Sequence, residues 1–383
     1  MKSSIYFSAL MVSALIVFFG CTKDQNQANI NTPAPVDVLK VKKDIQKTLQ
    51  EIQSHQGVST DVQTRVAGAF IVVPGGSVDA IKQALSDAGV GGVVYLRAGT
   101  HTENSNLVIT SQAIIVGEAG SILNIKSAPS IPGGDGLIPL NPAIHIMNAP
   151  SSAVLGVTIN PLGGDGSTGI LFENSPLSAS MYNAFNGFQY SIVVQNSDNP
   201  TIFGNKIVGS TLSARGGVGL ELGILVMNGK SAYLAQNDVS GNLAGLFLCD
   251  KYGTATQNNL HNNVFGVILC RIQDNTFKLP SGQAAGAISG ATNWKINTNT
   301  SSNNLAEGFE ITDGSTGNII QNNTTSGNTS FDIDLTGVTS RAGFLAKSSV
   351  NNSVTAGPTQ KVIDCGQGNT VTGGIIDKTT PCN

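Results

Sequence analysis

Four carboxylic acids gather late in the chain, at Glu310, Asp332, Asp334 and Asp313. In an extended strand, Asp332 and Asp334 would point to the same side about 6.6 Å apart. Carboxyl groups at such distances raise one another's pKa, and their separation overlaps that of the paired acids of glycoside hydrolases. Clustered oxygens also suit Ca²⁺, which Glu310, Asp332 and Asp334 could hold. We therefore weigh a polysaccharide-cleaving site, with calcium as an optional cofactor, against a solvated acidic edge.

A second group of side chains, Tyr252, Trp294, Asp250 and Arg271, could contact a ligand. Trp294 is the only tryptophan of the chain and could stack on a sugar ring or anchor a loop, and Tyr252 has the same two roles open to it. Asp250 and Arg271 are 21 residues apart and are expected to form a surface ion pair. His145, a lone histidine, more simply has a structural role.

The cysteines fall into three groups. Cys249 and Cys270 end two near-identical stretches, GLFLCD and GVILCR, and are expected to stack as thiols on neighbouring rungs. Cys365 and Cys382 are better placed for a disulfide that closes the C-terminal edge. Cys21 directly follows the apolar run at the N-terminus and belongs with that segment.

The N-terminus reads as a secretory signal, because Lys2 precedes an apolar run too short to span a bilayer comfortably. The run ends in FFGC, which resembles a bacterial lipobox. This resemblance implies that residues 1–20 are removed and that Cys21 is acylated, anchoring the chain to the lipid bilayer of the cell envelope. An outer-membrane lipoprotein is expected, with the side of the membrane left open.

Residues 21–66 are polar and suit a tether between anchor and body. Within them, apolar residues at three- and four-residue spacings predict an amphipathic helix over 38–53, which Asp37 can cap. This helix could be a stalk, a site of oligomerisation or an element docked on the body.

The body, residues 67–383, repeats itself. Strand-like stretches start at Ala143, Gly169, Ser191, Gly223, Gly245, Gly266, Gly308 and Ser330, with a basic step of 21 or 22 residues and longer steps that contain insertions, one at about 273–293. An asparagine precedes most of them, at Asn160, Asn183, Asn205, Asn237, Asn258, Asn299 and Asn322. Such a recurrence predicts stacked amides in an all-β solenoid, a single-stranded parallel β-helix.

The start of the body, PGGSVDAIKQALSDAGVGGVVYLRAG, predicts a capping helix over 77–88 followed by a strand. Together with LVITSQAIIVGE it resembles the start of pectin-lyase-like β-helix proteins. The resemblance implies a right-handed coil whose outward face holds polysaccharide. Signatures of the catalytic subfamilies, such as the paired aspartates of polygalacturonases or the DPHE of alginate epimerases, do not occur in the chain.

Alternation sorts each rung into inward and outward residues. The inward residues are apolar throughout, ending in Phe309 and Ile311 and then Phe331 and Ile333. The outward residues run from His145 through an apolar middle to the acidic end. A bare apolar stripe of this kind needs a cover, from the 38–53 helix, from the insertion or from a second copy.

Composition excludes some functions. The 21 basic and 24 acidic residues leave no surplus of positive charge for binding nucleic acid. Three hypotheses remain: an envelope lipoprotein that binds glycan without catalysis, a carbohydrate-active hydrolase or lyase using the late carboxylates, and a structural or self-associating surface protein.

Overall fold

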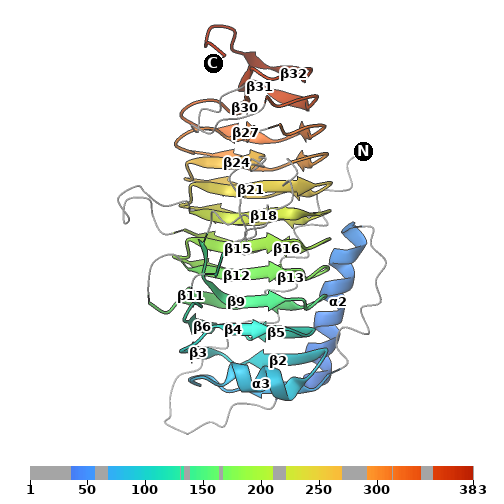
Figure 1. Cartoon of the computed structure of the whole chain (residues 1–383), viewed down its shortest axis with the longest axis vertical. Coiled ribbons are helices and arrows are strands. Elements are labelled where there is room, and N and C mark those ends of the chain that lie inside the picture. Colours follow the sequence, from blue (N-terminus) through green and yellow to red (C-terminus); the bar gives the residue numbers. More distant parts are fainter. Residues whose placement is uncertain are drawn as a thin grey trace, which may run out of the picture.

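The chain folds into a parallel β-helix, in which three strands per rung stack into three columns along the molecule (Figure 1). The computed structural model describes residues 36–56, 68–129, 131–132, 139–163, 167–209, 221–269, 291–312, 314–337 and 348–382. The expected signal peptide, Cys21 and most of the tether and of the 273–293 insertion lie outside these residues. Neither described helix is long and apolar enough to cross a membrane.

The first column contains β4 (Leu107–Ile109), β9 (Pro142–Met147), β12 (Thr168–Glu173), β15 (Tyr190–Gln195), β18 (Leu222–Lys230), β21 (Ala244–Lys251), β24 (Phe265–Leu269), β27 (Phe309–Ile311) and β30 (Ile333–Leu335). The second contains β1 (Phe70–Val73), β2 (Gly92–Leu96), β5 (Ala113–Gly117), β10 (Ala153–Leu155), β13 (Ala179–Met181), β16 (Thr201–Phe203), β19 (Tyr233–Ala235), β22 (Thr254–Thr256), β25 (Lys295–Asn297) and β28 (Ile319–Gln321). Two strands at the C-terminal end, β31 (Ser353–Asp364) and β32 (Thr370–Ile376), join these columns into one sheet of 21 strands.

The third column is a separate sheet of nine strands. Its strands are β3 (Gly99–Glu103), β6 (Ser121–Ile125), β11 (Thr158–Pro161), β14 (Ala184–Asn186), β17 (Lys206–Val208), β20 (Asp238–Ser240), β23 (Asn259–His261), β26 (Thr300–Ser302) and β29 (Thr324–Ser326). A short antiparallel pair, β7 (Ile131–Pro132) and β8 (Pro139–Leu140), stands apart from the rungs. Because every strand in the columns pairs with its counterpart one rung away, the inward residues form one continuous core.

The inward alternation is confirmed along the first column, but the predicted alignment of its last rung is wrong. Ile170, Ile192 and Ile224 pair in register and are fully buried. At the end of the column, however, Phe309 pairs with Ile333, so that Phe331 is not in the inward set and the predicted alignment is wrong by two residues. A shift of two preserves the alternation of strand side chains, and the pattern therefore could not detect it.

A buried asparagine ladder stands at the turn between the second and third columns. From Asn205 to Asn299, the side-chain amide nitrogen donates to the amide oxygen of the next rung, for example from Asn237 to Asn258 at 2.9 Å, and also to a backbone carbonyl. At the start of the ladder, the backbone N–H of Asn183 donates to Asn205 Oδ1 at 3.1 Å. The ladder consists of Asn183, Asn205, Asn237, Asn258, Asn299 and Asn323. Two predicted members are wrong: Asn322 has φ 55° and precedes the ladder residue, and Asn160 lies on β11.

Helix α3 (Ile81–Ala88) starts later than the predicted 77–88. The side chain of Ser77 does not cap it; instead Ser77 Oγ contacts His101 Nδ1, and Glu103 Oε1 accepts the N–H of Ile81 at 2.8 Å. A carboxylate from the third column thus replaces the local cap that the sequence pattern suggested. Gly89, with φ 67°, ends the helix as expected.

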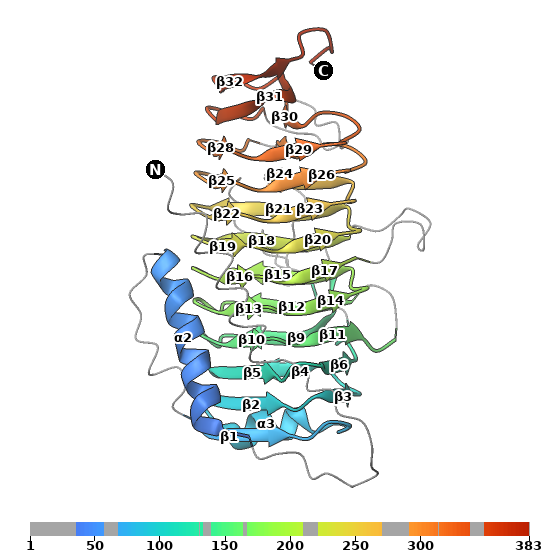
Figure 2. The ribbon, with the colours of Figure 1, turned by 180° about the vertical axis from the view of Figure 1, so that it is seen from behind.

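Helix α2 (Val38–Gln56) lies along the outside of the second column (Figure 2). The side chain of Asp37 caps it by accepting the N–H of Lys40 at 3.0 Å. Its buried residue Ile45 belongs to an apolar cluster with Val93, Ile114 and Met181 of the underlying strands. The helix is therefore docked on the body, and it covers the second column rather than the apolar stripe of the first.

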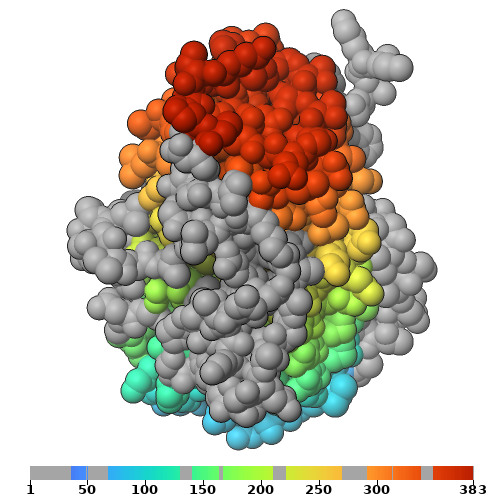
Figure 3. Space-filling model, turned by 45° about the horizontal axis from the view of Figure 1, so that its top comes forward, coloured from blue at the N-terminus to red at the C-terminus, as the bar shows by residue number. Residues whose placement is uncertain are grey.

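The last rungs form the C-terminal end of the stack, seen in red in Figure 3. Here Cys365, just after β31, forms a disulfide with Cys382, with an S–S distance of 2.01 Å. Ile375 on β32 is 56 % exposed, as expected for a strand that has a neighbour on one edge only.

Candidate functional site

The apolar stripe on the outward side of the first column is buried within a single chain. Leu171, Val193, Leu225 and Ile268 are each at most 3 % exposed, and Phe247 is half-buried. They form a cluster with other described residues, among them Leu140, Tyr190, Leu222 and Phe265. The expectation that the stripe is covered is confirmed, but α2 is not the cover. This part of the first column therefore offers no open surface to a ligand.

The acidic end of the first column is also closed. Glu310 pairs in register with Asp334, and both are 1 % exposed. The predicted pairing of Glu310 with Asp332 is wrong, because the register of the last rung is shifted by two residues from the predicted alignment. Asp332 instead accepts hydrogen bonds from Asn328 Nδ2 at 3.0 Å and from the N–H of Lys361 at 2.9 Å. Asp313 lies outside the described residues.

This arrangement does not present a carboxylate pair to a polymer. In a hydrolase, the acid and the base or nucleophile must both reach the glycosidic bond, whereas Glu310 and Asp334 are inaccessible. The described part of the chain also contains no group of three Asp, Glu, His or Cys side chains suited to a metal ion, so the calcium site expected at Glu310, Asp332 and Asp334 has no assembled ligands there.

The predicted ligand-binding group around Trp294 is mostly internal. Trp294 is fully buried, its ring lies against Gly253, and its indole N–H donates to the backbone carbonyl of Asp250 at 3.1 Å. It anchors the corner between the first and second columns. Tyr252 is 57 % exposed at this corner and remains available to a ligand. Arg271 lies outside the described residues.

Asp250 is buried, which contradicts the expected surface ion pair. Neither of its carboxylate oxygens has a hydrogen-bond partner in the described chain. Burial raises the pKa of Asp250 well above its ordinary value; the nearby Trp294 N–H opposes this effect and the charge of Asp198 adds to it. The protonated, neutral form is accordingly favoured, and the enclosed side chain is not accessible to a ligand.

The cysteine at the end of β21 also differs from expectation. Cys249 is disulfide-bonded, so the prediction of stacked free thiols is wrong for this residue. Cys365 and Cys382 bond to each other, which places the partner of Cys249 outside the described residues.

Two titratable side chains meet at the N-terminal end of the first column, where His145 Nε2 lies 2.7 Å from Glu173 Oε2. His145 is on β9 and Glu173 on β12, one rung further along. Both side chains are partly shielded, with 11 % and 27 % of their surface exposed. Sequence reasoning placed both in the outward columns but did not pair them, because they differ in rung and in position along the strand.

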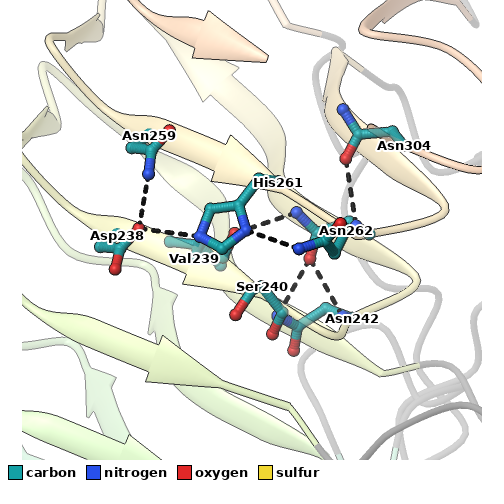
Figure 4. Close-up of polar contacts among 9 residues, drawn as sticks. Asp238, Val239, Ser240, Asn242, Asn259, His261, Asn262 and Asn304 are labelled. Atoms are coloured by element: carbon teal, nitrogen blue, oxygen red, sulfur yellow. Dashed lines mark hydrogen bonds and ion pairs between the residues drawn. The ribbon is translucent and has the colours of Figure 1, made fainter. Parts of the chain in front are cut away.

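The outward side of the third column carries a partly exposed polar network (Figure 4). Asp238 Oδ1 accepts hydrogen bonds from Asn259 Nδ2 at 2.8 Å and His261 Nε2 at 3.0 Å, and the other ring nitrogen of His261 lies 2.9 Å from Asn262 Nδ2. Because the Asn262 amide nitrogen can only donate, His261 Nδ1 accepts and Nε2 carries the hydrogen that bonds Asp238.

The local sequence explains this network. Strands β20 (DVS) and β23 (NLH) start 21 residues apart, and the central Val239 and Leu260 are fully buried in the core. Alternation then turns the first and third residue of each strand outward. Stacking one rung on the next brings Asp238 beside Asn259. The sequence signal is the repeated polar–apolar–polar triplet, which lies outside the glycine-started stretches of the first column.

The same outward side is polar over most of its length. Near the N-terminus, Asn186 Nδ2 donates to Asn160 Oδ1 at 2.9 Å and Asn160 Nδ2 donates to Asn124 Oδ1 at 3.0 Å. Further along, the outward residues are short and partly or fully exposed: Ser240, Thr300, Ser302, Thr324 and Ser326. We refer to Asp238, Asn259, His261, Asn262 and these neighbours as the polar face.

Comparison with known proteins agrees with the fold. A family model described as NosD, periplasmic copper-binding protein, matches residues 105–279, which is less than half of the chain. No curated protein sequence matches the chain significantly.

Among solved structures, a mutant tailspike of the Escherichia coli bacteriophage HK620, in complex with a pentasaccharide, has a TM-score of 0.51 and 12 % identity over 78 % of this chain. This chain covers 57 % of that protein. A family 28 exopolygalacturonase of Yersinia enterocolitica has a TM-score of 0.48 and 12 % identity, with 81 % and 76 % of the two chains covered. The chain thus has the right-handed parallel β-helix fold of the pectin-lyase-like proteins.

Proposed function

We propose that this protein binds a glycan on the polar face without cleaving it. The observation that carries the proposal is the ordered network around Asp238, in which neighbouring side chains are fixed in place while the group itself stays exposed. Asp238 and His261 retain 44 % and 28 % of their side-chain surface in contact with solvent.

Sugar hydroxyls both donate and accept hydrogen bonds, and the polar face offers both kinds of partner. Asp238 Oδ1 is occupied by Asn259 and His261, which leaves Oδ2 without a partner among the described residues. Neighbouring side chains already hold this carboxylate in place. Binding of a ligand hydroxyl therefore does not carry the entropic cost of ordering it. Bonds to a charged acceptor are also stronger than bonds between neutral groups.

The alternative of a hydrolase or lyase has less support, because the carboxylates that it would use, Glu310 and Asp334, are inaccessible. Self-association rested on the apolar stripe and on α2. The stripe and the α2 residues Val41 and Ile45 pack within one chain. The fold is shared with a tailspike solved with an oligosaccharide, which is consistent with a glycan ligand.

For the place of action we propose the bacterial cell envelope, with the chain held to a membrane through acylated Cys21. The support is the signal-like N-terminus that ends in FFGC and the match to a family model described as periplasmic. Radiolabelled palmitate incorporated by the wild-type chain but not by a Cys21→Ser variant would test the anchor.

The test of glycan binding uses affinity electrophoresis of the chain in gels that contain neutral or uronic polysaccharides. Asp238→Ala should be retarded less, with a dissociation constant at least about tenfold higher, because a charged acceptor is lost. Asp198→Ala, at an exposed turn in the ion pair with Lys230, is the matched control and should behave as the wild type. Equal retardation of wild type and Asp238→Ala by every bound polysaccharide would refute the proposed face.

Catalysis is tested in the same samples by following new reducing ends and unsaturated products, with and without Ca²⁺. We expect neither product from any bound polysaccharide. Product that disappears in an Asp332→Asn, Asp334→Asn double variant would instead establish an enzyme at the acidic end.

A second candidate function is copper binding. The observation that favours it is the His145–Glu173 pair, which lies within the residues matched by the copper-binding family model, beside the half-buried Met147. The copper content of the whole chain, purified from cells grown with added copper, would test this function independently of any particular site.

A further inference from the structure

Three side chains of different donor chemistry share the outward side of β9 and β12. His145 and Met147 are two residues apart on β9, and Glu173 on β12 pairs directly with Met147. Neighbouring strands are about 4.8 Å apart and alternate residues of one strand about 6.6 Å apart. An imidazole, a thioether and a carboxylate therefore start close enough together for their ends to reach one point.

His145 differs from the other histidines whose side chains the structure describes. Both ring nitrogens of His101 have structural partners, Ser77 Oγ at 2.9 Å and the carbonyl of Arg97 at 2.8 Å. Both ring nitrogens of His261 are also taken, as described above. His145, in contrast, bonds only through Nε2, and its partner is a carboxylate that can itself bind a metal.

Met147 likewise differs from the other described methionines. Met181 and Met227 are fully buried in apolar clusters, where a thioether acts as a flexible filler of the core. Met147 is only half-buried and belongs to neither cluster. Its thioether is therefore accessible beside His145 and Glu173.

The separation of the two polar donors suits a shared metal ion. Two ligand atoms that each lie about 2 Å from a metal, at a right angle to one another, are about 2.8 Å apart. His145 Nε2 and Glu173 Oε2 are 2.7 Å apart before any ion is present. Right-angled nitrogen and oxygen donors are typical of copper(II), and a thioether is a soft ligand that suits copper(I) or a weak axial position on copper(II).

We propose that His145 Nε2, Glu173 Oε2 and Met147 Sδ bind one copper ion. This assignment rests on the second function proposed above and names its site. On binding, Nε2 gives up the hydrogen that it shares with Oε2, so that both atoms can turn a lone pair to the ion, and that proton is released to solvent. The Glu173 carboxylate neutralises one unit of the metal charge.

The experiment is a titration of the whole chain with copper(II) sulfate, and with copper(I) under a reductant, against a chromophoric chelator that competes for the ion. The wild type should bind one copper per chain. His145→Asn and Glu173→Gln should each weaken binding at least about tenfold, because each removes a ligand. Met147→Leu should weaken copper(I) more than copper(II). The control is Met227→Leu, the same substitution at a buried methionine, which should bind as the wild type does.

The outcomes separate the site from the function. A wild type that binds no copper refutes the second proposed function and the site with it. A chain that binds copper with unchanged affinity in His145→Asn, Glu173→Gln and Met147→Leu retains that function but refutes this site. Circular dichroism of each variant establishes that it is folded, and Met147→Leu, which keeps the side-chain volume, decides the matter if the polar variants unfold.

Discussion

Asp250 should make this protein less stable as pH rises, and Asp250→Asn should remove that dependence. The carboxyl is fully buried without a hydrogen-bond partner in the described chain, and burial raises its pKa well above the ordinary value. The folded state therefore holds a proton that the unfolded state releases near pH 3.9. The stability that this proton provides is complete below that pH and is lost as pH rises through the folded pKa.

The magnitude follows from proton linkage. Between the unfolded and the folded pKa, each pH unit costs the wild type about 1.4 kcal/mol relative to a variant that cannot titrate. Two pH units inside this window amount to about 2.7 kcal/mol, or roughly 5 °C in melting temperature for a chain of this size. Asn has nearly the shape of Asp, but its amide brings unpaired donors of its own. The informative quantity is therefore how the difference in melting temperature between Asp250→Asn and the wild type changes with pH.

The assay is thermal unfolding followed by circular dichroism from pH 4 to pH 8. The melting temperature of Asp250→Asn relative to the wild type should increase with pH and then level off at the folded pKa. Asp87→Asn, at an exposed position on α3, controls for the loss of one carboxylate and should run parallel to the wild type. Parallel curves for Asp250→Asn and wild type over the whole range would refute the reasoning.

Three other predictions concern the scaffold. Asn258→Ala should cost about 3 kcal/mol in chemical unfolding, since it leaves buried groups of the ladder unpaired. Asn322→Gly, at an exposed position whose φ of 55° suits glycine, should cost less than about 1 kcal/mol, and equal costs would contradict the assigned ladder. Ile45→Asp places a charge in a site that is 5 % exposed and should release α2 from the body. Trypsin should then cleave the helix faster while the circular dichroism of the β-helix is unchanged, and an unchanged cleavage rate would argue against docking. Replacing Cys365 and Cys382 by Ala should cost about 3 kcal/mol, because the loop of 17 residues is no longer closed in the unfolded state, and unchanged stability would show that the last rungs need no closure.

The rung length, the inward alternation and the solenoid itself could be predicted from the sequence, because they follow from local periodicity. A strand exposes every second residue to the core, so Ile192 and Ile224 mark the inward side wherever their strands pair. The helix at Val38–Gln56 and its Asp37 cap were likewise local features. Only the face of the body on which this helix docks required contacts between distant segments.

The sites depended on tertiary structure, because burial and pairing are set by which rungs stack and by how many residues each turn contains. A shift of two residues, invisible to alternation, moved Asp334 rather than Asp332 beside Glu310. Asp250 looked like a surface residue until the corner formed by Trp294 enclosed it. His145 met Glu173, and Asp238 met His261, across rungs that the chain separates by more than twenty residues. Sequence alone therefore determined the periodic scaffold, whereas the stacking of its rungs decided which polar side chains are enclosed and which face solvent.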